Sequence, residues 1–293
     1  MITKDYVSEH MSNIVTTVHS EQSINAVLSH LEERHGYDFS DYARSTIDRR
    51  LHHFLVKEKI SSPSELIDKL KMQKMFHVKL TEALTVNFTE MFRDPSFFVS
   101  LTRKVFPFLA TYPSIKIWHA GCSTGEEVYS LAILLHELDL LHKTKIYATD
   151  MNETCLKTAS EGIYSFEQIR HYTHNYRKAE GRKDFSCYYE ATNNGARIHD
   201  FLKKNVSFFP HNLVSDHSFN EFHLILCRNV LIYFNRDLQG RVVDLFNKSL
   251  NNLGYLAIGN KENLLFNGQR KNFGIVDKEE KIYRKVVFSA QKL

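Results

Sequence analysis

A doubly wound α/β domain preceded by a small all-helical domain is the fold that this 293-residue sequence predicts. The first observation is an apolar run at 115–118 that stops at Gly121 and Gly125 and is followed at once by a helical pattern. The second is another short strand, 146–149, which ends in Asp150. The third is that apolar residues up to position 85 recur at helical spacing. We therefore divide the chain into a helical domain, 1–85, and an α/β domain, 86–293.

The helical domain is expected to contain four helices. The patterns predict helices over 23–35, 41–60 and 76–84, and Ser62 followed by Pro63 predicts the start of another. The second helix has a basic face formed by Arg44, Arg49, Arg50, Lys57 and Lys59. Such a face is ordinarily just solvated, but it can also be a docking surface for an acidic helix.

In the segment that joins the two domains, polar residues alternate with apolar and aromatic ones. Asn87, Thr89 and Arg93 are interleaved with Phe88, Met91 and Phe92. This segment is either a half-buried linker or a lid whose polar side chains face a ligand. Pro95 then opens a helix that runs to about Leu109.

The rest of the α/β domain follows the same strand and helix alternation. A helix at 152–160 ends at Gly162, and further strands are expected at 206–209, 222–226 and 254–258. Two last runs, 273–276 and 281–288, read as a closing antiparallel pair. Residues 165–204 are polar and tyrosine-rich and contain Asn193-Asn194-Gly195, a strong hairpin signal. We expect this segment to form an inserted β subdomain.

The glycine turn suggests which class of ligand the domain binds. It matches neither G-x-G-x-x-G nor the P-loop, because Glu126 and Glu127 stand where lysine and a hydroxyl would be. Two carboxylates at a helix start repel a pyrophosphate. S-adenosylmethionine (SAM), with its ammonium and sulfonium groups, fits better, and Asp150 is placed to accept bonds from ribose hydroxyls. A plain tight turn with acids that suit the helix dipole is the alternative.

Composition limits the remaining classes of function. The net charge of +4 does not indicate nucleic acid, and the four cysteines are scattered without a C-x-x-C pair. We expect no metal site and no disulfide framework. The N-terminus lacks the apolar core of a signal peptide, and no apolar run approaches the roughly 18 residues of a membrane span. A cytoplasmic protein is expected.

Five motifs together resemble the CheR-type chemotaxis receptor methyltransferases. They are Asn-x-Thr-x-x-Phe-Arg (87–93), Trp-x-Ala-Gly-Cys-Ser-Thr-Gly-Glu-Glu (118–127), Ala-Thr-Asp (148–150), Asn-Leu (212–213) and Cys-Arg-Asn-Val-Leu-Ile-Tyr-Phe (227–234). The resemblance covers roughly residues 20–287. It implies a class I SAM-methyltransferase fold and SAM-dependent methylation of glutamate side chains on receptor helices, with S-adenosylhomocysteine as product.

The resemblance also implies the site residues. Arg93 and Tyr233 would lie beside the methyl group and the incoming carboxylate. The cofactor would be lined by Asn87, Thr89, Arg93, Gly121, Glu126 or Glu127, Asp150, Asn212, Leu213, Arg228 and Asn229. Arg44, Arg49 and Arg50 would read the receptor helix, and the β subdomain would offer a docking surface. Two places depart from the family: His52, His53 and Phe54 follow Leu51 where a further arginine pair is usual, and Gly259-Asn260-Lys261-Glu262 replaces Gly-His-Ser-Glu.

A glutamate carboxylate is already ionised at neutral pH, so this reaction needs no general base. The expected partner is the cytoplasmic helical region of a chemoreceptor or a related signalling protein, without nucleic acid or membrane insertion, and the protein is expected to be a monomer. Two other functions remain open. A nucleic-acid base methyltransferase is disfavoured because Cys227-Arg-Asn-Val has no proline, and a non-catalytic SAM-binding signalling module is disfavoured by intact Arg93, Asp150 and Tyr233.

Overall fold

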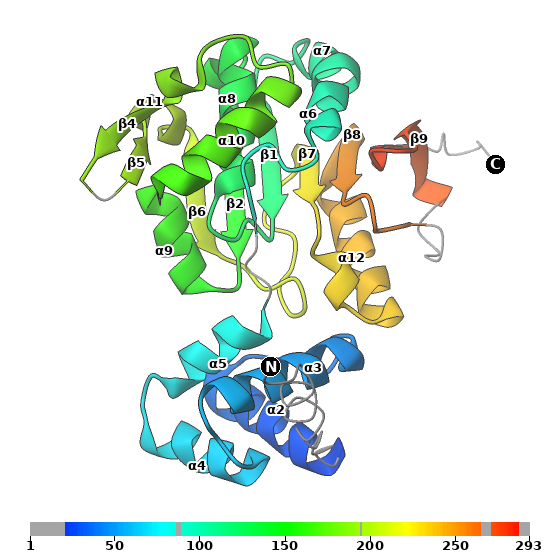
Figure 1. The fold of residues 1–293 in the computed structure, drawn as a ribbon. Coiled ribbons are helices and arrows are strands. Elements are labelled where there is room, and N and C mark those ends of the chain that lie inside the picture. Colours follow the sequence, from blue (N-terminus) through cyan, green and yellow to red (C-terminus); the bar gives the residue numbers. More distant parts are fainter. Residues whose placement is uncertain (1–20, 86–88, 194, 265–270, 287–293) are drawn as a thin grey trace, which may run out of the picture. The chain divides into compact units, whose positions relative to one another are not determined.

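The computed structural model describes residues 21–85, 89–193, 195–264 and 271–286. The chain divides into two compact units (Figure 1). The helical unit comprises the residues up to Ser40 together with Ser45–Leu84, and the sheet unit comprises Asp41–Arg44 together with Thr85 onward. Four residues from the middle of the helical sequence therefore belong, by their contacts, to the sheet unit.

The helical unit contains the four predicted helices, α2 (Glu21–His35), α3 (Arg44–Lys57), α4 (Pro63–Met72) and α5 (Phe76–Leu84). The start of α4 follows the predicted capping chemistry, because the Ser62 side chain accepts a hydrogen bond from the Glu65 amide and Pro63 occupies the first turn. Each helix buries its apolar stripe. The innermost side chains are Val27, Leu31, Ile47, Leu51, Leu66 and Leu80.

The sheet unit is built on a seven-stranded sheet in the order β6-β2-β1-β7-β8-β10-β9. The strands are β1 (Ile115–Ala120), β2 (Thr144–Asp150), β6 (Val206–Pro210), β7 (Phe222–Cys227), β8 (Leu250–Ile258), β9 (Phe273–Asp277) and β10 (Ile282–Lys285). The first five in spatial order are parallel, and β10 is antiparallel to both of its neighbours. The order reverses between β1 and β7, so the crevice at their carboxyl ends is the expected ligand site. The doubly wound sheet, the closing pair and the helical N-terminal part confirm the predicted fold class.

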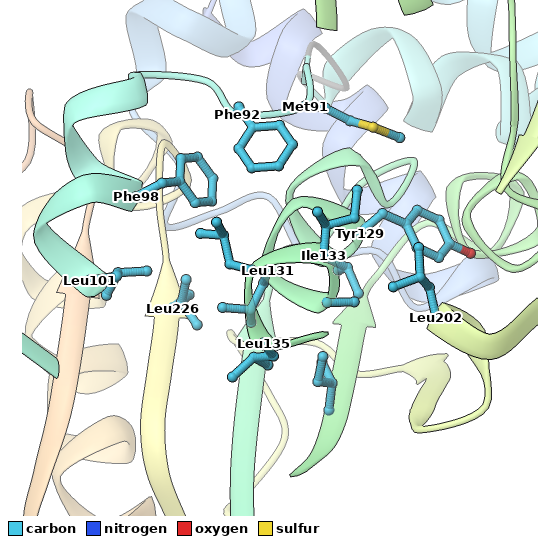
Figure 2. Packing of buried hydrophobic residues seen from close by; sticks show 14 of the residues in the cluster. Met91, Phe92, Phe98, Leu101, Tyr129, Leu131, Ile133, Leu135, Leu202 and Leu226 are labelled. Atoms are coloured by element: carbon cyan, nitrogen blue, oxygen red, sulfur yellow. The ribbon is translucent and has the colours of Figure 1, made fainter. Parts of the chain in front are cut away.

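Alternate residues of each strand enter two different cores, as the pleat requires. Ile117 and Leu224 belong to one cluster, and Trp118 and Ile225 to the other. The first cluster packs against α8 (Glu126–Glu137), and Figure 2 shows Leu131 and other side chains of this helix within it. The second packs against α12 (Arg236–Ser249). The helix that Pro95 opens is present as α6 (Pro95–Ser100), a π-helical turn (Leu101–Val105) and α7 (Phe106–Leu109).

The segment 165–204 forms the predicted hairpin but also a helix that we did not predict. The hairpin is β4 (Tyr189–Thr192) with β5 (Gly195–Ile198), and β3 (Ile163–Tyr164) adds a third strand beside β5; the turn residue Asn194 lies outside the described residues. The helix is α10 (Phe166–Lys178), which starts in a capping box between Ser165 and Gln168. Its buried residues Ile169, Tyr172 and Tyr176 recur at helical spacing, so two tyrosines of this tyrosine-rich segment belong to the apolar stripe of a helix.

The remaining elements are short connections, apart from α9 (Glu153–Glu161), which begins at the Asn152 cap and ends at left-handed Gly162 as predicted. They are α11 (Asp200–Lys203) and the 3₁₀ turns Leu141–Lys143, Phe185–Tyr188 and Leu231–Tyr233. Over the described part of the chain, every helix is too short or too polar to cross a membrane.

Candidate active site

Four adjacent parallel strands, β6, β2, β1 and β7, end at one edge of the sheet and bring the predicted cofactor residues together (Figure 1). Gly121 follows β1, Asp150 ends β2, Asn212 follows β6 and Arg228 follows β7. The register places Asp150 opposite Pro210 and Ala120 opposite Thr149. Gly121 and Asn212, 91 positions apart in the sequence, therefore lie at the same edge of the sheet.

The turn after β1 depends on its glycines. Gly121 has φ +77°, and a Cβ on it would come within 2.5 Å of Val230 Cγ2 in the loop after β7. Gly125 has φ +90°, and its Cβ would come within 2.9 Å of Ala159 on α9. A side chain at either position would both strain the backbone and push apart two segments that must meet. The turn is thereby held close to the sheet edge, and α8 begins directly after it.

Asp150 is fixed at the tip of β2 by two backbone amides. Ser123 N–H donates to Oδ2 over 2.8 Å, and Asn152 N–H donates to Oδ1 over 2.9 Å. Burial raises the pKa of Asp150, and these two amides oppose that rise. Each carboxylate oxygen has a second lone pair. Asp150 can thus accept hydrogen bonds from a pair of ligand hydroxyls.

Glu127 is held inside the protein by two basic side chains. Its Oε1 lies 3.0 Å from His119 Nε2, and its Oε2 accepts a hydrogen bond from Arg228. Burial alone would raise the pKa of Glu127, but the charges of Arg228 and His119 outweigh it and lower the pKa to about 2. Arg228 also donates to Asp94 Oδ2 over 2.7 Å and stacks 3.9 Å above the ring of Phe97. Glu127 and Arg228 form an internal ion pair at the site.

Among the described residues, Glu126 has hydroxyl rather than cationic partners. Its side chain accepts from Thr124 Oγ1 over 2.7 Å and from Tyr172 Oη over 3.3 Å, and the residue is 2% exposed. Burial raises the pKa of Glu126 to about 7. The two carboxylates at the start of α8 therefore differ in their surroundings. The charge of Arg228 balances Glu127, whereas the partners of Glu126 in the described part of the chain are hydroxyl groups.

The segment before α6 buries Phe92 and contacts both α8 and Arg228. The Phe92 amide donates to Ser130 Oγ on α8 over 2.8 Å, and Arg228 Nη1 lies 3.5 Å from the Arg93 carbonyl. Phe92 and Asp94 have φ +54° and +55°, so two non-glycine residues in the left-handed region flank Arg93. The Arg93 and Thr89 side chains are half-buried. Asn87 lies outside the described residues.

The loop after β7 carries Asn229 and Tyr233 and is held by a buried acid. Glu262 accepts hydrogen bonds from the amides of Gly259, Asn229 (3.2 Å) and Ile232 (3.2 Å). Asn229 has φ +60°, and Tyr233 ends the 3₁₀ turn with a half-buried side chain. The acid of the sequence Gly259-Asn260-Lys261-Glu262 thus fixes the backbone of this loop.

The turn after β6 is ordered by its own side chains. Asn212 Oδ1 accepts from the Val214 amide over 3.0 Å, and Asp216 Oδ2 accepts from the Asn212 amide over 2.8 Å. Leu213 is half-buried against the second core. Asn212 and Leu213 therefore stand in a fixed turn beside the tip of β2.

The three arginines predicted to read a receptor helix have different surroundings. Arg49 is exposed on α3. Arg50 is half-buried, and its Nη1 donates to the Ala83 carbonyl over 2.9 Å, so it braces the end of α5. Arg44 is half-buried at the first position of α3 and belongs to the sheet unit. Of the three, Arg49 is the one that faces solvent.

Three functional residues were missed at the sequence level. They are His119, Asp94 and Glu262, all of which hold predicted site residues in place. The alternation of β1 put His119 on the face opposite Trp118, which was the available signal for a contact with α8. Asp94 had no comparable signal, because its partner Arg228 is 134 residues away, and Glu262 was noted only as the last residue of Gly259-Asn260-Lys261-Glu262, without a role.

Comparisons with known proteins find matches over both parts of the chain. Residues 87–282 match the family model described as the CheR methyltransferase SAM-binding domain, and residues 22–85 match the CheR methyltransferase all-alpha domain. Cher3 of Pseudomonas putida is 45% identical over 252 residues, which are 86% of this chain and 92% of that protein. Chemotaxis protein methyltransferase 1 of Vibrio cholerae is 32% identical over 272 residues, covering 90% of this chain and 94% of that protein. A chemotaxis protein methyltransferase of Listeria monocytogenes is 30% identical over 232 residues, 78% of this chain and 86% of that protein.

The all-alpha model matches the residues of the four helices, and the SAM-binding model matches the residues of the sheet that follows. The matches cover 86% to 94% of the length of the three relatives. The sheet, the glycine turn, Asp150 and the loop after β7 all lie within the part of the chain that matches the SAM-binding domain. The chain belongs to the CheR methyltransferase family.

Proposed function

We propose that this protein transfers the methyl group of SAM to glutamate side chains on the cytoplasmic helical region of chemotaxis receptors, forming glutamyl methyl esters and S-adenosylhomocysteine. Two relatives that span most of the chain are named chemotaxis protein methyltransferases. The match to a SAM-binding domain and the order of the strands support SAM as the cofactor. The charge balance of the site supports a carboxylate as the acceptor.

The donor set of the crevice fits SAM. Asp150 has lone pairs left for the ribose hydroxyls after its two backbone amides. Asn212 and Leu213, in the fixed turn beside it, would border the adenine. When bound, SAM supplies a methyl group on a sulfonium, which is open to in-line displacement.

Glu126 is the acid that would pair with the cofactor's ammonium. Glu127 already has the charge of Arg228 and the bond to His119, so a second cation there would be superfluous. Glu126 accepts from the hydroxyls of Thr124 and Tyr172, and burial raises its pKa to about 7 against these bonds. An incoming ammonium would supply a positive charge there.

The observation that carries the acceptor assignment is that the acids of the described site are all held by internal donors. Arg228 holds Asp94 and Glu127, and backbone amides hold Asp150 and Glu262. Glu126 accepts from the hydroxyls of Thr124 and Tyr172, and the proposed pairing with the cofactor's ammonium would occupy it. An acceptor that must lose a proton therefore meets no poised base in the described crevice, whereas a glutamate carboxylate arrives ionised.

Alignment and exclusion of water are what the enzyme would then contribute. Well-oriented reactants can gain roughly 7–11 kcal/mol relative to a bimolecular reaction in solution. Tyr233 would hold one oxygen of the acceptor carboxylate. Arg93 would orient a carboxylate without forming a bidentate ion pair with it. Arg49, exposed on α3, would contact the acidic receptor helix, with Arg44 and Arg50 supporting it.

The assignment is tested by mapping the modified residues. The protein is incubated with SAM and with a purified receptor cytoplasmic fragment, and the methylated sites are located by tandem mass spectrometry. Methyl groups on glutamates, absent when those glutamates are replaced by alanine, are expected. Methyl groups on lysine, arginine or histidine side chains would refute the acceptor assignment.

A further inference from the structure

Residues Asp41–Ala43, which we call the strap, form a short antiparallel pairing with the segment that carries Tyr233. The Ala43 amide donates to the Tyr233 carbonyl over 2.7 Å, and the Asn235 amide donates to the Asp41 carbonyl over 2.8 Å. Tyr42 lies opposite Phe234 in the bridge between them. The strap comes from the sequence between α2 and α3, yet it belongs to the sheet unit.

Side chains reinforce this pairing on one side. Asp41 accepts from Asn235 Nδ2 over 3.0 Å and from Arg241 on α12. The bond with Arg241 and then the bond with Asn235 lower the pKa of Asp41 against the effect of its burial. Asp41 thus ties the strap to the start of α12, next to the Tyr233 turn.

Tyr42 extends the strap to the cofactor side of the crevice. Its ring packs edge to face against Phe234, with 5.1 Å between centroids, and its hydroxyl donates to Met151 Sδ over 3.3 Å. Met151 directly follows Asp150, the acid expected to bind the ribose. Three consecutive residues therefore touch both the segment of Tyr233 and the turn after Asp150.

The Tyr233 turn also has bonds of its own, from the Tyr233 amide to the Val230 carbonyl and from the Phe234 amide to the Leu231 carbonyl. Glu262 fixes the amides of Asn229 and Ile232, at the beginning of the loop, and Gln239 donates to the carbonyls of Leu231 and Phe234. The carbonyl of Tyr233 itself is bonded by the strap. Without the strap, the direction of the peptide that carries the Tyr233 side chain is less restricted.

We propose that the strap is a positioning segment for methyl transfer: it fixes Tyr233 through its backbone, and Asp41 is the positioning residue that anchors it. This inference rests on the role proposed for Tyr233 above. The helix α3, with the exposed Arg49, begins at Arg44, the residue after the strap.

The test compares Asp41→Ala and Asp41→Asn with Asp244→Ala. Asp244 also pairs with a basic residue of α12, Lys248, and its side chain is 33% exposed against 32% for Asp41, so it is a matched control away from the site. Asp41→Ala is expected to lower kcat roughly tenfold to a hundredfold, the range for small misplacements of a reacting group. The dissociation constant of SAM and the KM for the receptor fragment should stay within about twofold, and Asp41→Asn, which keeps the bond from Asn235, should recover most of the rate.

Two results would overturn the proposal. One is a kcat for Asp41→Ala equal to that of Asp244→Ala. The other is a parallel loss of SAM binding, thermal stability and rate, which would make Asp41 merely structural. A second readout separates this proposal from the proposed function: hydrogen exchange at the amides of Ala43 and Asn235 should be at least about tenfold faster in Asp41→Ala, with Asn229 unchanged.

If the wild-type protein methylates no glutamate, the proposed function fails, and the exchange measurement still decides whether the strap holds the Tyr233 segment. Unchanged exchange at Ala43 and Asn235 would then overturn the inference. Faster exchange confined to these two amides would support it, whatever the acceptor is.

Discussion

Replacing Glu126 by glutamine is expected to abolish the pH dependence of SAM binding below neutrality. In the free protein, burial raises the pKa of Glu126 to about 7, so the side chain is half protonated at that pH. An ammonium beside it would favour the charged form and lower the pKa on binding. SAM binding therefore releases a proton whenever Glu126 starts out protonated.

The magnitude follows from linkage. If the pKa falls well below 5 in the complex, the observed dissociation constant rises about tenfold for each pH unit below 7, or about 1.4 kcal/mol per unit. At pH 7, about half a proton should be released per SAM bound. The cofactor's own α-amino group has an ordinary pKa near 8, so the measurement belongs between about pH 5 and 7.5.

Isothermal titration calorimetry in buffers of different ionisation enthalpy measures both the affinity and the proton count. Wild type should give the slope, Glu126→Gln should bind more weakly at pH 7.5 and give a flat profile, and Glu153→Gln, at an exposed first position of α9, should keep the wild-type slope. A flat wild-type profile, or an unchanged slope in Glu126→Gln, would refute the pairing of Glu126 with the ammonium.

The same raised pKa predicts that Glu126→Gln stabilises the free protein. A carboxyl whose folded pKa is raised contributes stability below its unfolded pKa and loses it as pH rises through about 7, so thermal denaturation should favour the variant at pH 8 but not at pH 4.5, by up to about 3 kcal/mol. Glu127→Gln should do the opposite: it should destabilise by about 3 kcal/mol at pH 7 in urea unfolding, and the difference should shrink as pH falls from 4.5 toward 2; equal stability at pH 7 would contradict the Arg228 pair. Gly121→Ala should lower the melting temperature more than Gly36→Ala, because both have positive φ but only Gly121 would meet an atom within 4 Å; equal losses would argue against the close approach to Val230. Arg49→Glu should raise the KM for a receptor fragment at least about threefold without changing SAM affinity, and an unchanged KM would remove α3 from recognition.

Much of the sheet unit could be predicted from local patterns. The apolar runs of β1 and β2, the glycines between β1 and α8, and Asp150 at the strand end are all short-range signals, and parallel strands place their ends together by topology. The helix α10 was missed because tyrosines suit both strands and helices, although its capping box and its spacing of Ile169 and Tyr172 were present in the sequence.

What could not be predicted is which charged side chains pair inside the site. Glu127 and Arg228 are 101 residues apart, and Asp41 and Asn235 are 194 apart, so neither pair leaves a local pattern. The sequence presented Glu126 and Glu127 as equivalent, and only the position of Arg228 distinguishes them. For the same reason the strap looked like the start of a helix in the helical domain, whereas its contacts lie with Tyr233 and Met151.

The stability of the methylated product to base distinguishes a carboxylate acceptor from a nitrogen or carbon acceptor. The protein is incubated with methyl-labelled SAM and host membranes, and the washed membranes are treated with mild alkali. Methyl esters are expected to release volatile labelled methanol, and Asp150→Ala, which would lose the proposed bonds to the ribose, should release little. Label that stays on the protein in alkali would mean methylation of nitrogen or carbon and would contradict the glutamate assignment.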